Sequence, residues 1–390
     1  MNRKNLLTLA QVALAVALLA YVLSGVPRRD SAISRAGATD AAAAVEGTIV
    51  GPSGVRRPWE AQIVEFEVAG GERKAIDSSR YEVKPGILTL SRYLDVGLYL
   101  IGAGLLLVGA FMAFARWWML VRVLSIPFTY GQAVKWSFVG FFFNNVVPGL
   151  VGGDLPKMYF VARGAPNKTH AVLTVAVDRL LGLFGLALVA GVALAFDWQR
   201  YQSPELRGVA LPIVAVLAGS LVGFVVAGSS RLRGLLLRNP LVRRVGPLER
   251  ILAKVDEAMG LYRGRPAVLA TALALSCGNH ILSMVAWWLF AKALGGTLAL
   301  GPYFVFVPLI QMAKSVPLTP SGWGVGEALF ARLAPLYGES ATLGVALSIA
   351  YNLTYLGFSL VGGVLLLTSR DRVSASEMQR GLETPSAAGA

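Results

Sequence analysis

Long apolar runs without charged residues are the main pattern of this chain. A helix needs about 20 apolar residues to cross a bilayer. Five runs of this kind contain no Lys, Arg, Asp or Glu: 6–26, 96–115, 209–230, 267–291 and 340–369. A sixth run, 171–196, is equally apolar except for Asp178 and Arg179. The pattern therefore predicts about six spanning helices.

The first run has two interpretations. It is longer than the apolar core of a typical signal peptide, and no clear small-x-small cleavage site precedes Pro27. We interpret residues 1–26 as an uncleaved transmembrane anchor. A cleaved signal peptide is the alternative.

Two shorter apolar stretches, 136–153 and 293–313, run into Gly/Pro-rich sequence. The Gly/Pro-rich sequence of the first begins within the stretch and reads Asn144-Asn-Val-Val-Pro148-Gly-Leu-Val-Gly-Gly-Asp154-Leu-Pro-Lys157. The second is followed by Lys314-Ser-Val-Pro-Leu-Thr-Pro320-Ser-Gly-Trp-Gly-Val-Gly-Glu327. Proline breaks helices, and non-helical backbone at membrane depth is tolerated only inside protein or beside a wet cavity. These stretches predict two re-entrant helical hairpins that face a cavity.

The two hairpins fall in segments of opposite predicted orientation. The first lies between runs 96–115 and 171–196, and the second lies between runs 267–291 and 340–369, which cross in the reverse order. Inverted repeats with broken helices in matching positions indicate a transporter's binding site. A chance match is the alternative, because Gly and Pro are frequent in membrane helices. The predicted fold is an all-α polytopic membrane protein.

Segment 27–95 is the sizeable part of the chain without a long apolar run. Its Ala/Gly-rich part, 36–44, is typical of a linker, and residues 64–68 alternate apolar and acidic side chains as a half-buried strand does. Gly70-Gly71 predicts a turn, and further short strands are predicted at 81–83 and 87–90. We expect a small β-rich extracytoplasmic insertion that caps the membrane domain or, alternatively, docks an envelope protein.

Composition supports the membrane class. Of the 390 residues, 55% are hydrophobic and 15% are charged, whereas soluble proteins have about 25% charged residues. A water-soluble enzyme of this size is therefore excluded. With one cysteine, Cys277, and two histidines, the chain offers almost no ligands for zinc or haem, and we expect no cofactor.

The net charge of +14 indicates an orientation. With the N-terminus inside, the excess of Lys and Arg falls in the inner segments 1–5, 116–170 and 231–265. Because cytoplasmic loops are enriched in Lys and Arg, both termini are predicted to be cytoplasmic. The basic surface is expected to contact anionic lipids and not nucleic acid.

Asp178 and Arg179 lie well inside an apolar run, where charged residues usually mark a site or a pair. Neighbouring residues on a helix point about 100° apart, so each needs a partner elsewhere. We expect Arg179 to pair with Asp154 or Glu327, and Asp178 to pair with Lys157 or Lys314. A purely structural ion pair is the alternative.

The candidate substrate-binding residues are those of the two helix breaks and the polar residues of the neighbouring apolar runs. They are Asn144, Asn145, Pro148, Gly152, Gly153, Asp154, Lys157, Asp178, Arg179, Lys314, Pro320, Gly322, Gly324, Gly326, Glu327 and Asn352. We further predict that Asp154, Arg179 and Glu327 line one central cavity.

Three motifs resemble those of the lysylphosphatidylglycerol synthase transmembrane-domain family. They are Asn-x-x-x-Pro-Gly-x-x-Gly-Gly-Asp154, Asp178-Arg179-x-x-Gly182 and Pro320-x-Gly-x-Gly-x-Gly-Glu327, within 96–369. The resemblance implies a flippase-like, multi-pass protein of the bacterial inner membrane that handles lipid or lipid-linked substrates. Two departures concern the family's arginines: this chain has Lys157 after Gly-Gly-Asp, and Asn352 in the final run. Segment 27–95 is also not expected of the family.

We predict four parts: an anchor (1–26), the insertion (27–95), a flippase-like domain (96–369) and a disordered cytoplasmic tail (370–390). The family's aminoacyl transfer is attributed to a separate soluble domain, for which the tail is too short. The predicted function is a flippase or transporter of an anionic or polyprenyl-linked lipid, and not an enzyme. The alternatives are a non-transporting scaffold for envelope lipid or glycan synthesis, and an intramembrane lipid-modifying enzyme. His280 and Ser283 lie one turn apart, but without a G-x-S-x-G elbow we interpret His280 as a packing residue.

Overall fold

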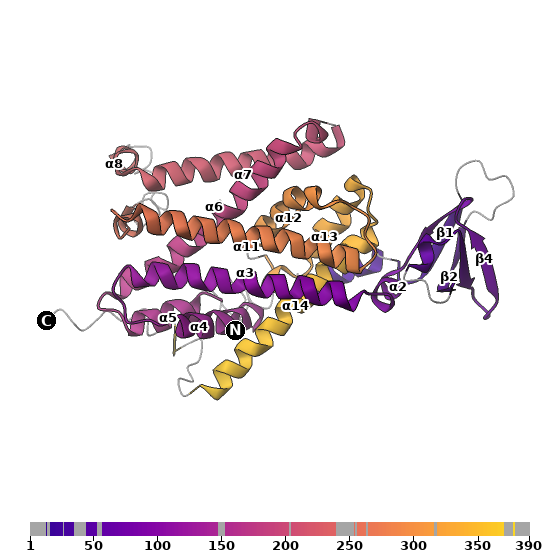
Figure 1. Ribbon diagram of the computed structural model, residues 1–390, viewed down its shortest axis with the longest axis horizontal. Coiled ribbons are helices and arrows are strands. Elements are labelled where there is room, and N and C mark those ends of the chain that lie inside the picture. The colour runs from indigo at the N-terminus through magenta and orange to yellow at the C-terminus, as the bar shows by residue number, and fades with distance from the viewer. Residues whose placement is uncertain are drawn as a thin grey trace. The chain divides into compact units, whose positions relative to one another are not determined.

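A computed structural model of the chain is mostly helical and contains one small sheet (Figure 1). It describes residues 13, 16–25, 27–34, 44–52, 57–146, 153–202, 204–238, 253, 256–262, 264–315, 318–369 and 377–378. The chain divides into two compact units. Unit 1 consists of Met1–Ala103, Ala286–Pro302 and Ala313–Leu353, and unit 2 consists of Gly104–Val285, Tyr303–Met312 and Thr354–Ala390.

Four of the described helices are long and apolar enough to cross a membrane. They are α3 (Val96–Arg122), α6 (Lys168–Phe196), α11 (Pro266–Ala293) and α14 (Ala341–Thr368), and each falls on a predicted run. The first predicted run overlaps a short apolar helix, Val16–Gly25. Run 209–230 falls on α7 (Pro204–Gly228). The total of six spans stays a prediction.

Helix α3 extends seven residues beyond the predicted end of its run. The sequence places the end at Ala115 because Arg116 is charged, but the helix continues to Arg122. The reason is tertiary: Arg116 is paired within unit 2, and Trp117, Leu120 and Val121 are fully buried there.

The sheet lies in unit 1 and has five antiparallel strands in the order β4-β3-β2-β1-β5. The strands are β1 (Asp30–Ser34), β2 (Ala44–Gly51), β3 (Ile63–Glu67), β4 (Arg73–Asp77) and β5 (Tyr81–Lys84). The predicted strands at 64–68 and 81–83 and the glycine turn between β3 and β4 are confirmed, with φ of 100° at Gly70 and 81° at Gly71. The buried side chains of one face are Ala32, Ile49, Val64, Phe66 and Ile76. Residues 36–43 of the predicted linker lie outside the described residues, and Ala44 begins β2.

The predicted strand at 87–90 is wrong, because these residues begin the helix α2 (Ile87–Arg92). The side chain of Asp30, buried in β1, accepts hydrogen bonds from the Gly86 N–H at 2.6 Å and from the Thr89 hydroxyl at 2.8 Å. These bonds hold the first turn of the helix against the sheet. Apolar alternation over four residues could not distinguish this helix from a strand.

The remaining elements of unit 1 are helical or single turns. They are the turn Pro58–Glu60, the turn η3 (Pro320–Gly322), α13 (Val325–Leu333) and the turn Ala334–Tyr337. The buried ring of Trp287 stacks on Phe330 and Tyr351, with ring centroids 4.7 and 4.1 Å apart. This aromatic stack joins α11, α13 and α14 inside unit 1.

Unit 2 contains α4 (Tyr130–Val146), α5 (Leu155–Arg163), α6, the turn Arg200–Gln202, α7 and α8 (Ser230–Arg238). A core cluster of unit 2 includes Trp117, Trp136, Val139, Phe143 and Phe160. The middle of α12 (Leu300–Lys314) and the end of α14 also belong to unit 2.

Both Gly/Pro-rich stretches interrupt helices, as the sequence predicts. Helix α4 ends at Val146 and α5 begins at Leu155; α12 ends at Lys314 and α13 begins at Val325. Pro148 and Gly152 lie outside the described residues. The re-entrant course of these stretches and their inverted relation stay predictions.

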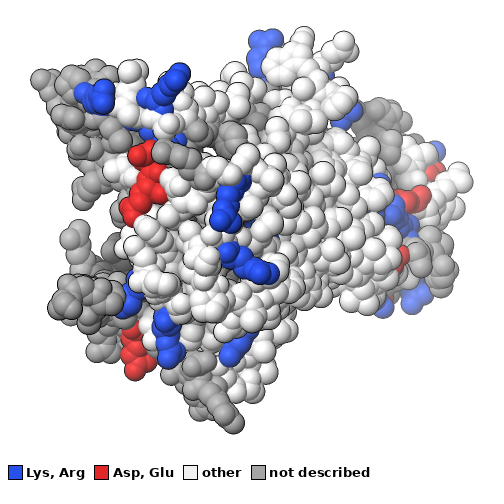
Figure 2. Space-filling model, turned by 60° about the vertical axis from the view of Figure 1, so that its left-hand side comes forward, with Lys and Arg blue, Asp and Glu red and all other residues white. Residues whose placement is uncertain are grey.

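The surface of the helices is mostly uncharged. Figure 2 shows broad areas without Lys, Arg, Asp or Glu, and the charged residues gather in separate groups. Large apolar side chains on α3, α6 and α14 are exposed, among them Leu100, Leu183 and Leu360. Exposed apolar faces of this kind are suited to contact with lipid.

Candidate functional site

In unit 2, Asp178 is the centre of a buried cluster of charges. Its carboxylate accepts a hydrogen bond from Arg116 Nε at 2.7 Å and lies 3.9 Å from Lys157 Nζ. The side chains of Arg116 and Asp178 are each 7% exposed, and that of Lys157 is 15% exposed. Lys157 also lies over the Trp117 ring, 5.0 Å from its centroid. Helices α3, α5 and α6 thus each contribute one charge to a site that water barely reaches.

Arg116 is the functional candidate that the sequence analysis missed. Its guanidinium lies against Gly182, one turn after Asp178 on α6, where a Cβ would come within 3.3 Å of Nη2. Nη1 is buried and has no hydrogen-bond partner among the described residues. The signal in the sequence was weak: Arg116 is simply the first charge after an apolar run, which usually indicates a helix end at the membrane surface.

A second ion pair lies next to the first. Arg179 pairs through Nε with the Asp154 carboxylate, which directly precedes α5. Arg179 is 45% exposed and Asp154 is 16% exposed. Gly153 is buried, and the Asn144 side chain lies where its Cβ would be. The amide of Asn145 instead donates to the Phe141 carbonyl oxygen of its own helix.

Tyr262 is a further neighbour of Asp178. It lies just before α11 and outside the four long apolar helices. Its hydroxyl donates to the Leu120 carbonyl oxygen at 3.3 Å. Burial raises the pKa of Tyr262 above its usual range, and the negative charge of Asp178 raises it further. The hydroxyl therefore stays protonated and acts as a donor.

In unit 1, Glu327 is the centre of a separate polar network. Its carboxylate is fully buried and accepts hydrogen bonds from the Gly324 N–H at 2.7 Å, Asn352 Nδ2 at 2.7 Å and the Ser348 hydroxyl at 3.2 Å. Lys314 Nζ donates to Asn352 Oδ1 at 2.8 Å. The Asn352 amide, which the sequence analysis names as a candidate substrate-binding residue, therefore bridges Lys314 and Glu327 within the protein.

The glycines of the second break give this network its shape. Gly322 and Gly324 have φ of 73° and 82°, a region that favours glycine. A Cβ on Gly326 would come within 2.9 Å of Ser348 Oγ and 3.2 Å of Lys314 Cδ. Pro320 opens the turn η3 that precedes them.

The predicted charge pairs are partly confirmed. Arg179 pairs with Asp154, and Asp178 pairs with Lys157, as two of the predicted options state. The other two options, Glu327 and Lys314, are bridged to each other by Asn352 within unit 1. That Asp154, Arg179 and Glu327 line one cavity stays a prediction.

His280 makes the contacts of a packing residue. Its Nε2–H donates to the Gly182 carbonyl oxygen at 2.9 Å, whereas the Ser283 hydroxyl accepts from Gln311 at 3.3 Å. On the preceding turn of α11, the Ser276 hydroxyl donates to the Leu181 carbonyl oxygen at 3.0 Å. These contacts join α11 to α6 in unit 2 and do not orient His280 toward Ser283.

Comparison with known proteins identifies relatives of the chain. The sequence model of a family described as "Lysylphosphatidylglycerol synthase TM region" matches residues 86–363. The chain is also similar to a UPF0104 membrane protein, PH1989, of Pyrococcus horikoshii. The two are 22% identical over 282 residues, which cover 67% of this chain and 84% of the relative. No solved structure gives a significant match.

Proposed function

Because the chain belongs to the family of lysylphosphatidylglycerol synthase transmembrane regions, we propose that it moves a lipid across the membrane by binding the anionic headgroup. We place headgroup binding at the buried charges around Asp178 in unit 2. The proposed setting is a bacterial inner membrane, with both termini cytoplasmic and membrane lipids as the partners.

The observation that carries this proposal is the unpaired Nη1 of Arg116. A buried donor without a partner costs about 1–3 kcal/mol, and this one lies beside a second buried cation, Lys157. Two cations face one carboxylate, Asp178, at this point. A phosphate oxygen would satisfy the free donor and balance the extra positive charge.

The donor chemistry also fits a phosphate. The guanidinium of Arg116 presents several N–H donors in one plane, and Lys157 supplies a compact charge. Charge-assisted hydrogen bonds from such groups to phosphate are short and strong. The acyl chains of the lipid would remain among the exposed apolar side chains of the helices.

Transport by the purified chain in vesicles tests the proposal. We expect fluorescent phosphatidylglycerol or a polyprenyl phosphate to cross the bilayer faster than in empty vesicles, as measured by dithionite quenching. Arg116→Gln removes a hydrogen bond from a charged group. Such a bond contributes about 1.5–3 kcal/mol to binding, which corresponds to about a tenfold or greater loss of the transport rate. Arg122→Gln is the matched control, because Arg122 is exposed at the end of the same helix, and it should keep the rate.

Other outcomes separate the competing functions. Equal rates for wild type, Arg116→Gln and empty vesicles would contradict transport and favour a scaffold that docks an envelope protein through segment 27–95. A change in lipid mass during the assay would favour a lipid-modifying enzyme. The contacts of His280 and Ser283 do not support that enzyme.

A further inference from the structure

Unit 1 contains a pocket beside the sheet, at the ends of two spanning helices. Its volume is about 440 Å³, within the range of about 300–1,000 Å³ that is typical of small-molecule sites. The walls come from the turn at 57–59, from residues 93–98 at the start of α3 and from residues 292–295 at the end of α11. None of the residues of the two clusters described above lines this pocket. Arg57 and Trp59 also lie outside the part of the chain that matches the family.

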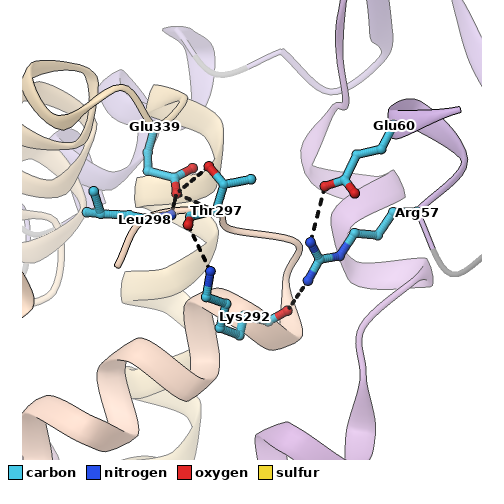
Figure 3. A network of polar contacts seen from close by, with 6 residues as sticks. All are labelled: Arg57, Glu60, Lys292, Thr297, Leu298 and Glu339. Carbon is cyan, nitrogen blue, oxygen red and sulfur yellow. Dashed lines mark hydrogen bonds and ion pairs between the residues drawn. The ribbon is translucent and has the colours of Figure 1, made fainter. Parts of the chain in front are cut away.

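Two cations line the pocket and are held in place by a polar network (Figure 3). Arg57 donates through Nη1 to Glu60 at 3.1 Å and through Nη2 to the Lys292 carbonyl oxygen at 3.2 Å. Lys292 Nζ donates to the Thr297 carbonyl oxygen at 2.9 Å. Glu339 in turn accepts from the Thr297 N–H at 2.7 Å and fixes this turn of the chain.

The other walls of the pocket are aromatic and apolar. Trp59 and Tyr93 meet edge to face, with ring centroids 5.9 Å apart. A Cβ on Gly295 would come within 2.6 Å of the Trp59 ring, and Gly295 has φ of 93°. The carboxylate in the lining, Asp95, is engaged with the start of α3, where it accepts from the Leu98 N–H at 3.1 Å.

The helix that starts at the pocket is suited to lipid chains. On α3, Val96, Leu100 and Ile101 are 58%, 60% and 56% exposed. Trp and Tyr are enriched at the membrane–water interface, which is where the start of a spanning helix lies. The pocket therefore combines cations and aromatic rings with a neighbouring exposed apolar face, and these are the three kinds of surface that the phosphate, glycerol and acyl chains of a phospholipid would contact.

We propose that this pocket binds the phosphate-bearing headgroup of a phospholipid, with Arg57 and Lys292 on the phosphate and the acyl chains along the start of α3. The Trp59 and Tyr93 rings cover the glycerol portion. The inference goes beyond the proposed transport function, because it assigns a binding site to unit 1 that transport does not require. It also gives the turn at 57–60 of the insertion a role in lipid binding.

Photo-crosslinking of the full chain in nanodiscs tests this site by itself. The probe is phosphatidylglycerol with a photoreactive headgroup, and crosslinked peptides are mapped by mass spectrometry. We expect crosslinks on peptides that contain Trp59 and Tyr93. Lys292→Gln should reduce them about tenfold or more, since a charge-assisted bond to phosphate is lost. This variant keeps the bond from Arg57, which goes to the main-chain oxygen of residue 292.

Three further variants and one competition measurement complete the experiment. Arg57→Gln should give the same loss as Lys292→Gln, and Arg80→Gln, at an exposed position just before β5, should give none. Arg116→Gln should keep the crosslinks even where transport is lost, so failure of one proposal is distinguishable from failure of the other. Unchanged crosslinks in both Arg57→Gln and Lys292→Gln would overturn the proposal. Equal competition by free glycerol 1-phosphate and by phosphatidylglycerol would show that the pocket does not require the acyl chains, and would overturn the assignment of a phospholipid as its ligand.

Discussion

At the scale of single residues, Asp178 determines whether the charges inside unit 2 are tolerated. Its carboxylate is the shared acceptor of Arg116 and the neighbour of Lys157, and all three side chains are at least four-fifths buried. Isolated charges in such surroundings are costly. The cluster is therefore stable only while the carboxylate of Asp178 is present.

Asp178→Asn should lower the free energy of unfolding by about 3–5 kcal/mol, because two buried cations lose their counter-charge. Unfolding by SDS titration in mixed micelles would measure the change. Asp197→Asn is the matched control, since Asp197 forms an exposed pair with Arg200 at the end of the same helix, and such pairs contribute about 0–1 kcal/mol. Adding Arg116→Gln to Asp178→Asn should restore part of the loss. Equal stability of Asp178→Asn and wild type would contradict this account.

At the scale of elements, glycine allows helices of unit 2 to approach one another closely. Gly362 of α14 lies directly over the Phe138 carbonyl of α4, and Gly185 of α6 lies over Ser276 of α11. Small residues at such crossings are usual in membrane proteins, where packing and not the hydrophobic effect drives helix association. Any side chain at these positions would separate the two helices.

Gly362→Ala should therefore destabilise the protein by about 1–3 kcal/mol through overpacking. Gly357→Ala in the same helix has open space around its Cβ and should be neutral or up to about 1 kcal/mol stabilising. Thermal unfolding of both variants in one detergent checks the contrast. Similar melting temperatures for the two variants would show that α4 and α14 are not in backbone contact.

The sheet depends on one buried carboxylate. Asp30 is 1% exposed and accepts from the Ile49 N–H at 2.5 Å in addition to its bonds to Gly86 and Thr89. Asp30→Asn replaces one acceptor oxygen by a donor and should cost about 1–3 kcal/mol. We expect faster proteolysis within residues 27–95, whereas Glu67→Gln, at an exposed position of β3, should leave the rate unchanged.

At the scale of the whole molecule, the distribution of charge predicts how the chain crosses the membrane. Most of the excess of Lys and Arg lies in 1–5, 116–170 and 231–265, and these segments are expected on the cytoplasmic side. Part of this charge is used locally: Arg233 of α8 is buried and pairs with Asp256 at 2.5 Å. Arg116 and Lys157 are likewise buried around Asp178, and we expect the other basic residues of these segments to contact anionic lipid headgroups.

Cysteine labelling on a Cys277→Ser background would test this orientation. Glu72→Cys, in the exposed turn between β3 and β4, should react with an impermeant maleimide in spheroplasts. Arg231→Cys, at an exposed position of α8, should react only after permeabilisation. The reverse pattern would mean that the insertion is cytoplasmic and that the basic segments are outside.

The sequence by itself determined the features that depend on local patterns. Long apolar runs, three of them without a charge and one interrupted by Asp178 and Arg179, located the four long apolar helices, since spanning length follows from bilayer thickness. Proline and glycine located both helix breaks, and period-two alternation located β3. Most of the candidate residues could be named in the same way, because a charge or a break within an apolar run is visible locally.

Only the tertiary structure decided which of these residues meet. Arg116 is 62 positions from Asp178, and no local pattern distinguishes it from a charge at a helix end. Asn352 bridges Lys314 and Glu327 across 38 and 25 positions, and the sequence could only offer these two charges as alternative partners of Asp178 and Arg179. Residues 87–90 form a helix because the Asp30 side chain, in strand β1, accepts hydrogen bonds from the first turn of that helix. In each case the deciding contact is long-range, and its geometry is set by the packing of whole elements.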